Sequence, residues 1–162
     1  MKKLTSLIAA LICAANLVAG EKVVAPVVVQ DTSLGLTAKA FAASVIEDTD
    51  DYAFGGGVSL EVPVFYNLSL EAVGSVFEDE LYTVGANVLY YVPVSESFSV
   101  YALSGGSYEF ETDQWTVSAG GGVKYALSKQ FSLFADGAYT WTVENDNEDG
   151  VVLVRAGVGF SF

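Results

Sequence analysis

The stretch that decides the fold is Val151–Phe162, with the sequence VVLVRAGVGFSF. Apolar and small residues fill almost all of it, yet a cation, Arg155, stands near its centre, and an aromatic residue is its last member. Successive side chains of a strand point to opposite faces, so Arg155 and Ala156 must face opposite ways. The fold therefore has to offer this strand an apolar environment on one face and a partner for a charge on the other.

The first twenty residues have the features of a secretory signal peptide. Two lysines, Lys2 and Lys3, precede an apolar run from Leu7 to Ala15, and small residues follow at Ala19 and Gly20. This order of charge, apolar core and small residues is typical of export signals, and the run is too short to span a bilayer as a helix. We expect residues 1–20 to be a signal peptide and residues 21–33 to be a short periplasmic arm.

Composition after residue 20 excludes several classes of protein. No cysteine or histidine remains, and 5 basic against 20 acidic side chains give a net charge of −15. Such acidity argues against nucleic acid as a partner. The whole sequence is 52% hydrophobic, which is too apolar for a disordered chain, yet no later stretch approaches the ~18 apolar residues of a membrane helix. A secreted β-sandwich and an outer-membrane β-barrel remain.

From residue 34 onward the chain repeats one pattern, in which runs of alternating apolar and small or polar residues are separated by turn-forming clusters. The eight runs are 34–45, 52–63, 67–77, 81–92, 98–110, 115–127, 131–143 and 151–162. Strands of soluble proteins usually have about five or six residues, whereas a tilted transmembrane strand needs ~9–11. The lengths predict an all-β fold, an eight-stranded antiparallel up-and-down transmembrane β-barrel over residues 34–162.

The connections between these runs are of two kinds, and the kinds alternate. The acidic ones are 45–51, 78–80, 111–114 and 144–150, and the short, nearly neutral ones are 63–67, 93–97 and 128–130. Up-and-down strands place alternate connections on opposite sides of the membrane. We expect the acidic loops to face outside and the short turns to face the periplasm.

Charges in the middle of the runs fall on one face only. The six are Lys39, Glu61, Glu71, Lys124, Asp136 and Arg155. Each shares its face with small and polar residues, while the opposite face of every run carries no charge. We predict that the six form a balanced ionic network inside the barrel, because sliding a strand by one residue would move a Lys or Arg into lipid at a cost of ~2–4 kcal/mol.

Aromatic residues separate the barrel from the sandwich. Of the 21 Phe, Tyr and Trp residues, we place nine at the outer ends of the runs: Tyr52, Phe54, Phe77, Tyr82, Tyr108, Phe110, Trp115, Tyr139 and Trp141. Nine lie at the turn ends: Phe65, Tyr66, Tyr90, Tyr91, Phe98, Tyr125, Phe131, Phe160 and Phe162. Only Phe41, Tyr101 and Phe134 lie mid-run, on the inward face. Two aromatic belts are typical of membrane interfaces, and a soluble sandwich explains neither belt.

The segment 120–141, GGGVKYALSKQFSLFADGAYTW, resembles the sixth strand, turn and seventh strand of small OmpA/OmpX-like outer-membrane β-barrel proteins. Residues 157–162, GVGFSF, are similar to the closing strand of that family. The resemblance implies a barrel in the outer membrane of a Gram-negative-type envelope. It also implies that Val158, Phe160 and Phe162 form the C-terminal signal recognised by the barrel assembly machinery.

The sequence offers little for catalysis, so we expect a protein that is not an enzyme and holds no cofactor. Histidine, the usual general base for a serine nucleophile, is absent. Asp136 with Glu61 or Glu71 could form an acid pair, but an ion-pair network with the interior cations is the better interpretation.

The last acidic loop resembles the beginning of a calcium-binding loop at Asn145, Asn147, Asp149 and Gly150. The required glutamate is replaced by Ala156, so we predict no dedicated metal site. A weaker hypothesis is that divalent cations bridge the loop carboxylates to lipopolysaccharide phosphates. The residues concerned are Glu47, Asp48, Asp50, Asp51, Glu78, Asp79, Glu80, Glu111, Asp113, Glu144, Asp146, Glu148 and Asp149.

Three functions remain open at this point. The first is a structural or surface-interaction role in the cell envelope, for a monomer in contact with membrane lipid and lipopolysaccharide. The second is a narrow channel for ions or small solutes, because interior glycines could leave room for water. Those glycines are Gly55, Gly57, Gly85, Gly105, Gly120, Gly122, Gly157 and Gly159. The third is an adhesin or receptor that acts through the acidic loops.

Overall fold

The computed structural model describes residues 35–46, 52–78, 81–143 and 150–162. The predicted signal peptide, the predicted arm and parts of three acidic loops lie outside the described residues. The described part contains no helix with the length and hydropathy of a membrane-spanning helix.

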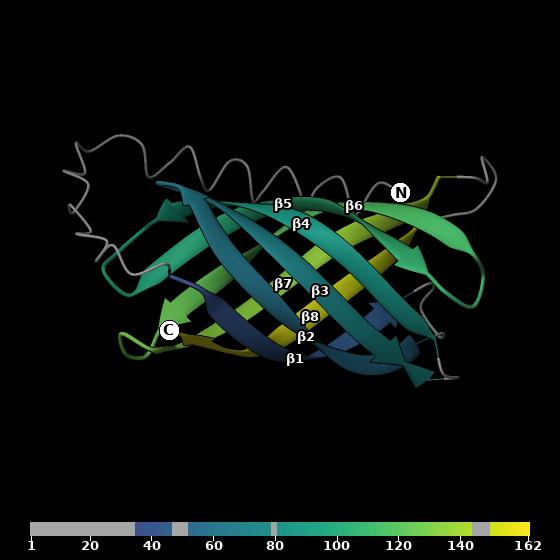
Figure 1. Cartoon of the computed structure of the whole chain (residues 1–162), viewed down its shortest axis with the longest axis horizontal. Coiled ribbons are helices and arrows are strands. Elements are labelled where there is room, and N and C mark those ends of the chain that lie inside the picture. Colours follow the sequence, from purple (N-terminus) through teal and green to yellow (C-terminus); the bar gives the residue numbers. More distant parts are fainter. Residues whose placement is uncertain (1–34, 47–51, 79–80, 144–149) are drawn as a thin grey trace.

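Within the described residues the chain forms eight strands that close into one barrel (Figure 1). Their bounds are β1 Thr37–Ile46, β2 Tyr52–Phe65, β3 Leu68–Phe77, β4 Tyr82–Pro93, β5 Phe98–Glu109, β6 Gln114–Ala126, β7 Phe131–Thr142 and β8 Val151–Ser161. Each strand pairs antiparallel with the next along the chain. Pairing of β1 with β8, from Thr37 with Ser161 to Ile46 with Val152, closes the sheet and leaves no edge. The predicted eight-stranded transmembrane-type barrel is thus confirmed.

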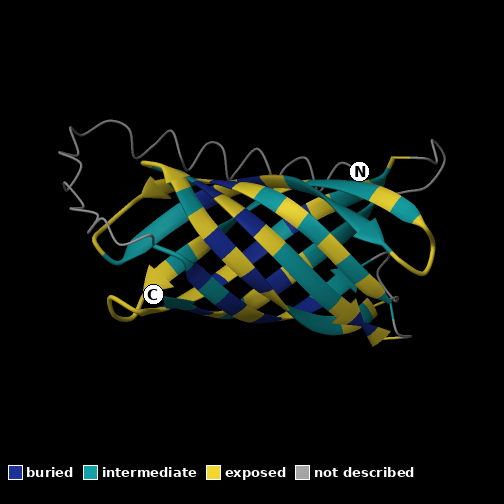
Figure 2. Ribbon diagram, in the orientation of Figure 1, coloured by how far each residue is buried: buried dark blue, intermediate teal, exposed yellow. Residues whose placement is uncertain are grey.

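Alternation along each strand produces two environments, visible in Figure 2 as ribbons on which exposed residues alternate with buried or intermediate ones. Apolar residues such as Val58 and Val158 are exposed, at 65% and 52%. Charged residues such as Glu71 are buried, at 1%. A water-soluble protein has the reverse arrangement, whereas a barrel in lipid needs an apolar exterior and satisfies its polar groups inside.

Two of the short turns share one construction. In each, a serine hydroxyl accepts a hydrogen bond from the amide N–H three residues later, at 3.1 Å between Ser95 Oγ and Phe98 N and 3.0 Å between Ser128 Oγ and Phe131 N. The amide of each serine donates back to the carbonyl of the same phenylalanine. Serine is favoured in such turns because its hydroxyl can replace a backbone partner. These local bonds fix where β5 and β7 begin.

One predicted connection is shorter than expected. The sequence analysis placed a connection at 63–67, but β2 continues through Pro63 to Phe65. The pairing register with β3 shifts between Pro63 and Phe65, next to a proline that lacks the N–H needed for the ladder. The strand thereby extends two residues beyond its predicted end at residue 63.

Candidate functional site

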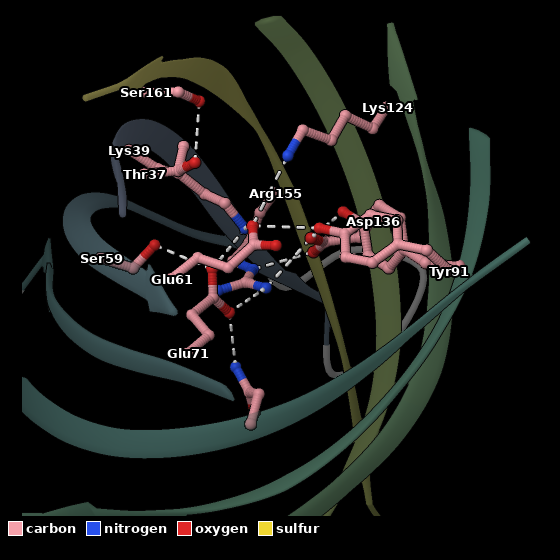
Figure 3. A network of polar contacts seen from close by, with 12 residues as sticks. Thr37, Lys39, Ser59, Glu61, Glu71, Tyr91, Lys124, Asp136, Arg155 and Ser161 are labelled. Atoms are coloured by element: carbon pink, nitrogen blue, oxygen red, sulfur yellow. Dashed lines mark hydrogen bonds and ion pairs between the residues drawn. The ribbon is translucent and has the colours of Figure 1, made fainter. Parts of the chain in front are cut away.

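The six charged side chains predicted to face inward form one connected chain, in which positive and negative groups alternate (Figure 3). The chain runs through Lys124, Glu61, Lys39, Glu71, Arg155 and Asp136. The nitrogen-to-oxygen distances between successive members are 3.8, 2.8, 2.9, 3.2 and 2.8 Å. Three cations meet three carboxylates, so the network has no net formal charge.

Glu71 lies at the centre of this network and is the most thoroughly satisfied carboxylate in it. Its Oε1 accepts hydrogen bonds from Lys39 Nζ at 2.9 Å and Ser59 Oγ at 2.8 Å. Its Oε2 accepts from Asn87 Nδ2 at 2.9 Å and Arg155 Nη2 at 3.2 Å. Four donors around one buried carboxylate offset the large cost of removing its charge from water.

Asp136 and Arg155 face each other on the paired strands β7 and β8. Arg155 Nε donates to Asp136 Oδ1 at 2.8 Å, and Arg155 Nη2 donates to Asp136 Oδ2 at 3.0 Å. This two-point geometry is the strongest that an arginine makes with a carboxylate. The cation of the closing strand, Arg155, therefore has its charged partner on the neighbouring strand.

Besides Ser59, three further residues take part that the sequence reasoning did not include. Tyr91 Oη donates to Glu61 Oε2 at 3.0 Å, Tyr101 Oη donates to Asp136 Oδ2 at 2.8 Å, and Asn87 donates to Glu71. The six charges come from β1, β2, β3, β6, β7 and β8, and these three residues come from β4 and β5. All eight strands of the described barrel are therefore joined across its interior.

Aromatic rings accompany the cations. Lys39 Nζ lies 5.1 Å from the ring centroid of Phe134, Arg155 Cζ lies 5.2 Å from that of Phe41, and Lys124 Nζ lies 5.2 Å from that of Tyr91. A cation over a ring face in a water-poor site gains roughly 1–2 kcal/mol. Phe41, Tyr101 and Phe134 are all buried, as expected, and they fill the lumen at the level of the ion pairs.

Two aromatic residues that we assigned to the belts face inward instead. Phe77 is buried at 7% and packs with Phe41 and Phe134, and Tyr91 belongs to the ion network. Strand parity explains both positions: Phe77 shares a face with Glu71, six residues earlier in β3, and Tyr91 must oppose its lipid-facing neighbour Tyr90. The belts are otherwise built from rings on the outer face.

Interior glycines make room for these rings. A Cβ added to Gly57 would lie 2.6 Å from Phe41 Cζ, and one added to Gly122 would lie 2.7 Å from Tyr101 Cζ. Real Cβ contacts are never so short, so only glycine fits here. At this level the space left by the absent side chains is occupied by rings, which disagrees with the expectation that it could hold water.

On the acidic-loop side of the ion network the lumen contains a cavity of about 620 Å³, which we call the vestibule. It reaches from Phe41, Asp136 and Arg155 up to Thr112, in the connection between β5 and β6. Among the described residues, its lining includes neither Lys39 nor Lys124, so it ends at the ion network. The barrel is thus filled toward its short turns and hollow toward its acidic loops.

Few of the loop carboxylates can be described. Glu78, Glu111 and Asp113 are exposed at the loop end. Asp113 accepts a hydrogen bond from Tyr108 Oη. The others lie outside the described residues, with Asn145, Asn147 and most of the candidate calcium loop. In the described ranges, no three acidic side chains are grouped as a metal site would require.

The predicted assembly signal lies at the turn end of β8, on its outer face. Val158 and Phe162 are exposed, at 52% and 63%. Phe160 packs edge-on against both Phe131 and Phe162, with ring centroids 5.1 Å apart in each pair. The three side chains are therefore presented to lipid as one apolar row.

Comparison with known proteins gives structural neighbours only. No family model matches the sequence, and no curated protein matches it. The fold is similar to the N-terminal β-barrel domain of Pseudomonas aeruginosa OprF, with a TM-score of 0.65, 16% identity, and coverage of 80% of this chain and 98% of that one. It is also similar to neisserial surface protein A, with a TM-score of 0.62, 16% identity, and coverage of 79% and 97%.

The chain has the fold of the small outer-membrane barrels. A de novo designed transmembrane β-barrel is similar as well, with a TM-score of 0.58, 19% identity, and coverage of 78% of this chain and 95% of that one. Identities this low show the fold alone. Because a designed protein shares the architecture, the barrel by itself indicates no particular role.

Proposed function

We propose that the protein is an integral outer-membrane barrel, closed by its own ion-pair network, with a structural or surface-interaction role in the cell envelope. The observation that carries this proposal is the network that joins all eight strands of the described barrel. Its groups are paired with one another, and rings fill the space beside them. An ion crossing the barrel would have to separate these pairs in a water-poor interior, at a cost of several kcal/mol.

The proposed setting is a Gram-negative-type envelope, reached through the signal peptide at residues 1–20. The short turns then face the periplasm, and the acidic loops face lipopolysaccharide, with divalent cations between carboxylate and phosphate. The assembly machinery recognises Val158, Phe160 and Phe162, and the folded protein is a monomer. The apolar exterior, the outward position of these three residues and the similarity to outer-membrane barrels support this setting.

We propose no catalytic activity. The three carboxylates of the ion network are engaged by cations, so none of these three is available as a general base in the arrangement described. The sequence contains no histidine that could take that role.

The test is single-channel recording of the refolded protein in a planar bilayer. Folding is confirmed beforehand by a heat-sensitive shift in gel mobility. We expect a folded barrel that produces no conductance steps. Reproducible steps that change when Arg155 or Glu71 is neutralised would instead establish the protein as a pore with the network as its constriction.

That second function, a narrow channel, is favoured by one observation. The vestibule already opens the half of the barrel nearest the acidic loops, so the ion pairs and the rings beside them separate it from the turn end. The adhesin hypothesis receives no comparable support, because parts of three loops lie outside the described residues.

A further inference from the structure

The vestibule has two unlike walls. On one side, β1, β3, β8 and the residue before β4 contribute apolar side chains that pack as one cluster with Phe41, namely Val45, Val73, Phe77, Leu81 and Leu153. The two hydroxyls on this side, Ser75 and Thr83, bond each other at 2.7 Å. On the other side, β5, β6 and β7 contribute hydroxyl, amide and carboxylate groups, including Ser107, Glu109, Gln114, Thr116, Ser118 and Thr140. A ligand that fits both walls must be apolar on one face and rich in hydrogen-bonding groups on the other.

The polar wall has hydrogen-bonding capacity to spare. Ser107 Oγ and Thr116 Oγ1 bond each other at 2.7 Å, but each hydroxyl has one donor and two acceptor positions. Among the described residues, Thr140 Oγ1 is the buried side-chain oxygen that lacks a partner. That oxygen is closed off from solvent, so the positions the wall offers to an occupant are the remaining acceptor positions of Ser107 and Thr116.

Charge at the mouth selects the sign of the ligand. Glu109 lines the vestibule, and so does Thr112 in the connection between β5 and β6. The described connection residues at this end, 78, 81, 110–113, 143 and 150, include the exposed carboxylates Glu78, Glu111 and Asp113 and no Lys or Arg. The nearest cation, Arg155, is already held by Asp136 and Glu71. The mouth therefore repels anions and attracts cations.

We propose that the vestibule binds a small polyhydroxylated ring compound that carries an amine, of the amino-sugar class. The C–H face of the ring packs on Phe77 and Leu153, and the hydroxyl groups bond Ser107 and Thr116 on the polar wall. The ammonium group lies toward Glu109. The volume of about 620 Å³ falls within the roughly 300–1,000 Å³ typical of small-ligand sites. This site is independent of whether the barrel conducts.

Three pyranoses that differ in charge provide the probes: glucosamine, glucose and glucuronate. Their binding to the refolded protein in detergent micelles is measured by saturation-transfer NMR and titration. We expect glucosamine to bind most tightly, glucose more weakly by roughly fivefold, and glucuronate not measurably. Equal affinity for the first two, preference for glucuronate, or no binding to a folded barrel overturns the proposal.

Variants locate the site. Glu109→Gln should reduce glucosamine affinity to that of glucose and leave glucose unchanged. Ser118→Phe should fill the vestibule and abolish binding, while the control Val117→Phe, one residue away on the outer face of β6, should bind as the unaltered protein does. Each variant is first shown to be heat-modifiable. Retained binding by a folded Ser118→Phe protein, or loss in Val117→Phe, places the ligand elsewhere and contradicts the assignment.

Discussion

Glu71 illustrates how a residue with a full charge can be buried at 1% exposure in this barrel. Each of its oxygens has two donors, and two of the four donors, Lys39 and Arg155, are themselves charged. The carboxylate is therefore the point at which both halves of the ion network meet. Removing its charge leaves two cations with one carboxylate partner each, Glu61 for Lys39 and Asp136 for Arg155.

We expect Glu71→Gln to lower the free energy of unfolding by about 3–5 kcal/mol, because breaking a buried pair leaves uncompensated charge inside the barrel. The measurement is urea unfolding in lipid vesicles, followed by tryptophan fluorescence. The control is Glu96→Gln in the exposed turn before β5, which should change stability by less than about 0.5 kcal/mol. Equal effects of the two substitutions would show that the network does not stabilise the fold.

At the residue scale, the sequence predicted the direction of a side chain correctly where only one physical requirement decided it. Lipid rejects charge, so the parity of each strand placed all six charged residues in the lumen. Phe77 and Tyr91 were missed because both an interface belt and a lumen accept an aromatic ring at a strand end. The alternation of side chains along a strand could have identified one of them, because Tyr90 and Tyr91 are adjacent and cannot both face lipid.

At the scale of elements, a side chain has less space on the lumen face of a strand than on its outer face, as two glycines show. Gly57 in β2 faces the lumen, where Phe41 and the backbone of β3 occupy the space that a side chain would need. Gly74 in β3 pairs with Val58, the next residue along β2, and a Cβ added to it meets nothing within 4 Å. The same residue type thus has opposite packing roles in two adjacent strands.

This difference predicts opposite results for one substitution. Gly57→Ala should destabilise the barrel by about 1–3 kcal/mol, because the added methyl group overpacks the interior. Gly74→Ala should change stability by no more than about 0.5 kcal/mol. Both are measured by the same urea unfolding, and a Gly57→Ala protein as stable as Gly74→Ala would mean that both the ring of Phe41 and the backbone of β3 can move aside.

Elements were easier to predict than the contacts between them. Strand ends agree with the sequence to within three residues because the turn residues are local signals, as the matching serines Ser95 and Ser128 show. Which charges meet could not be read from the sequence. Lys124 reaches Glu61 from β6 to β2, across the barrel, and such a contact depends on the stagger of all the strands together.

At the scale of the whole molecule, the barrel is filled at one end and hollow at the other. Ion pairs and rings occupy the half near the short turns, and the vestibule occupies the half near the acidic loops. The sequence indicated a plugged interior but gave no sign of this asymmetry. This asymmetry arises because the loop-side ends of β5, β6 and β7 carry small hydroxyl side chains such as Ser107, Ser118 and Thr140. Larger side chains fill the lumen nearer the short turns.

The position of the whole barrel in a membrane is tested by its two tryptophans, Trp115 and Trp141, which are the only ones in the sequence. Both are on the outer surface near the loop end, exposed at 57% and 41%. In lipid vesicles, we expect lipids brominated near the headgroup to quench their fluorescence strongly and lipids brominated near the chain end to quench it weakly, because aromatic belts lie at the interface. Trp115→Phe should retain this depth profile through Trp141. A folded protein quenched by aqueous acrylamide but by neither lipid would contradict membrane insertion and favour a water-soluble barrel.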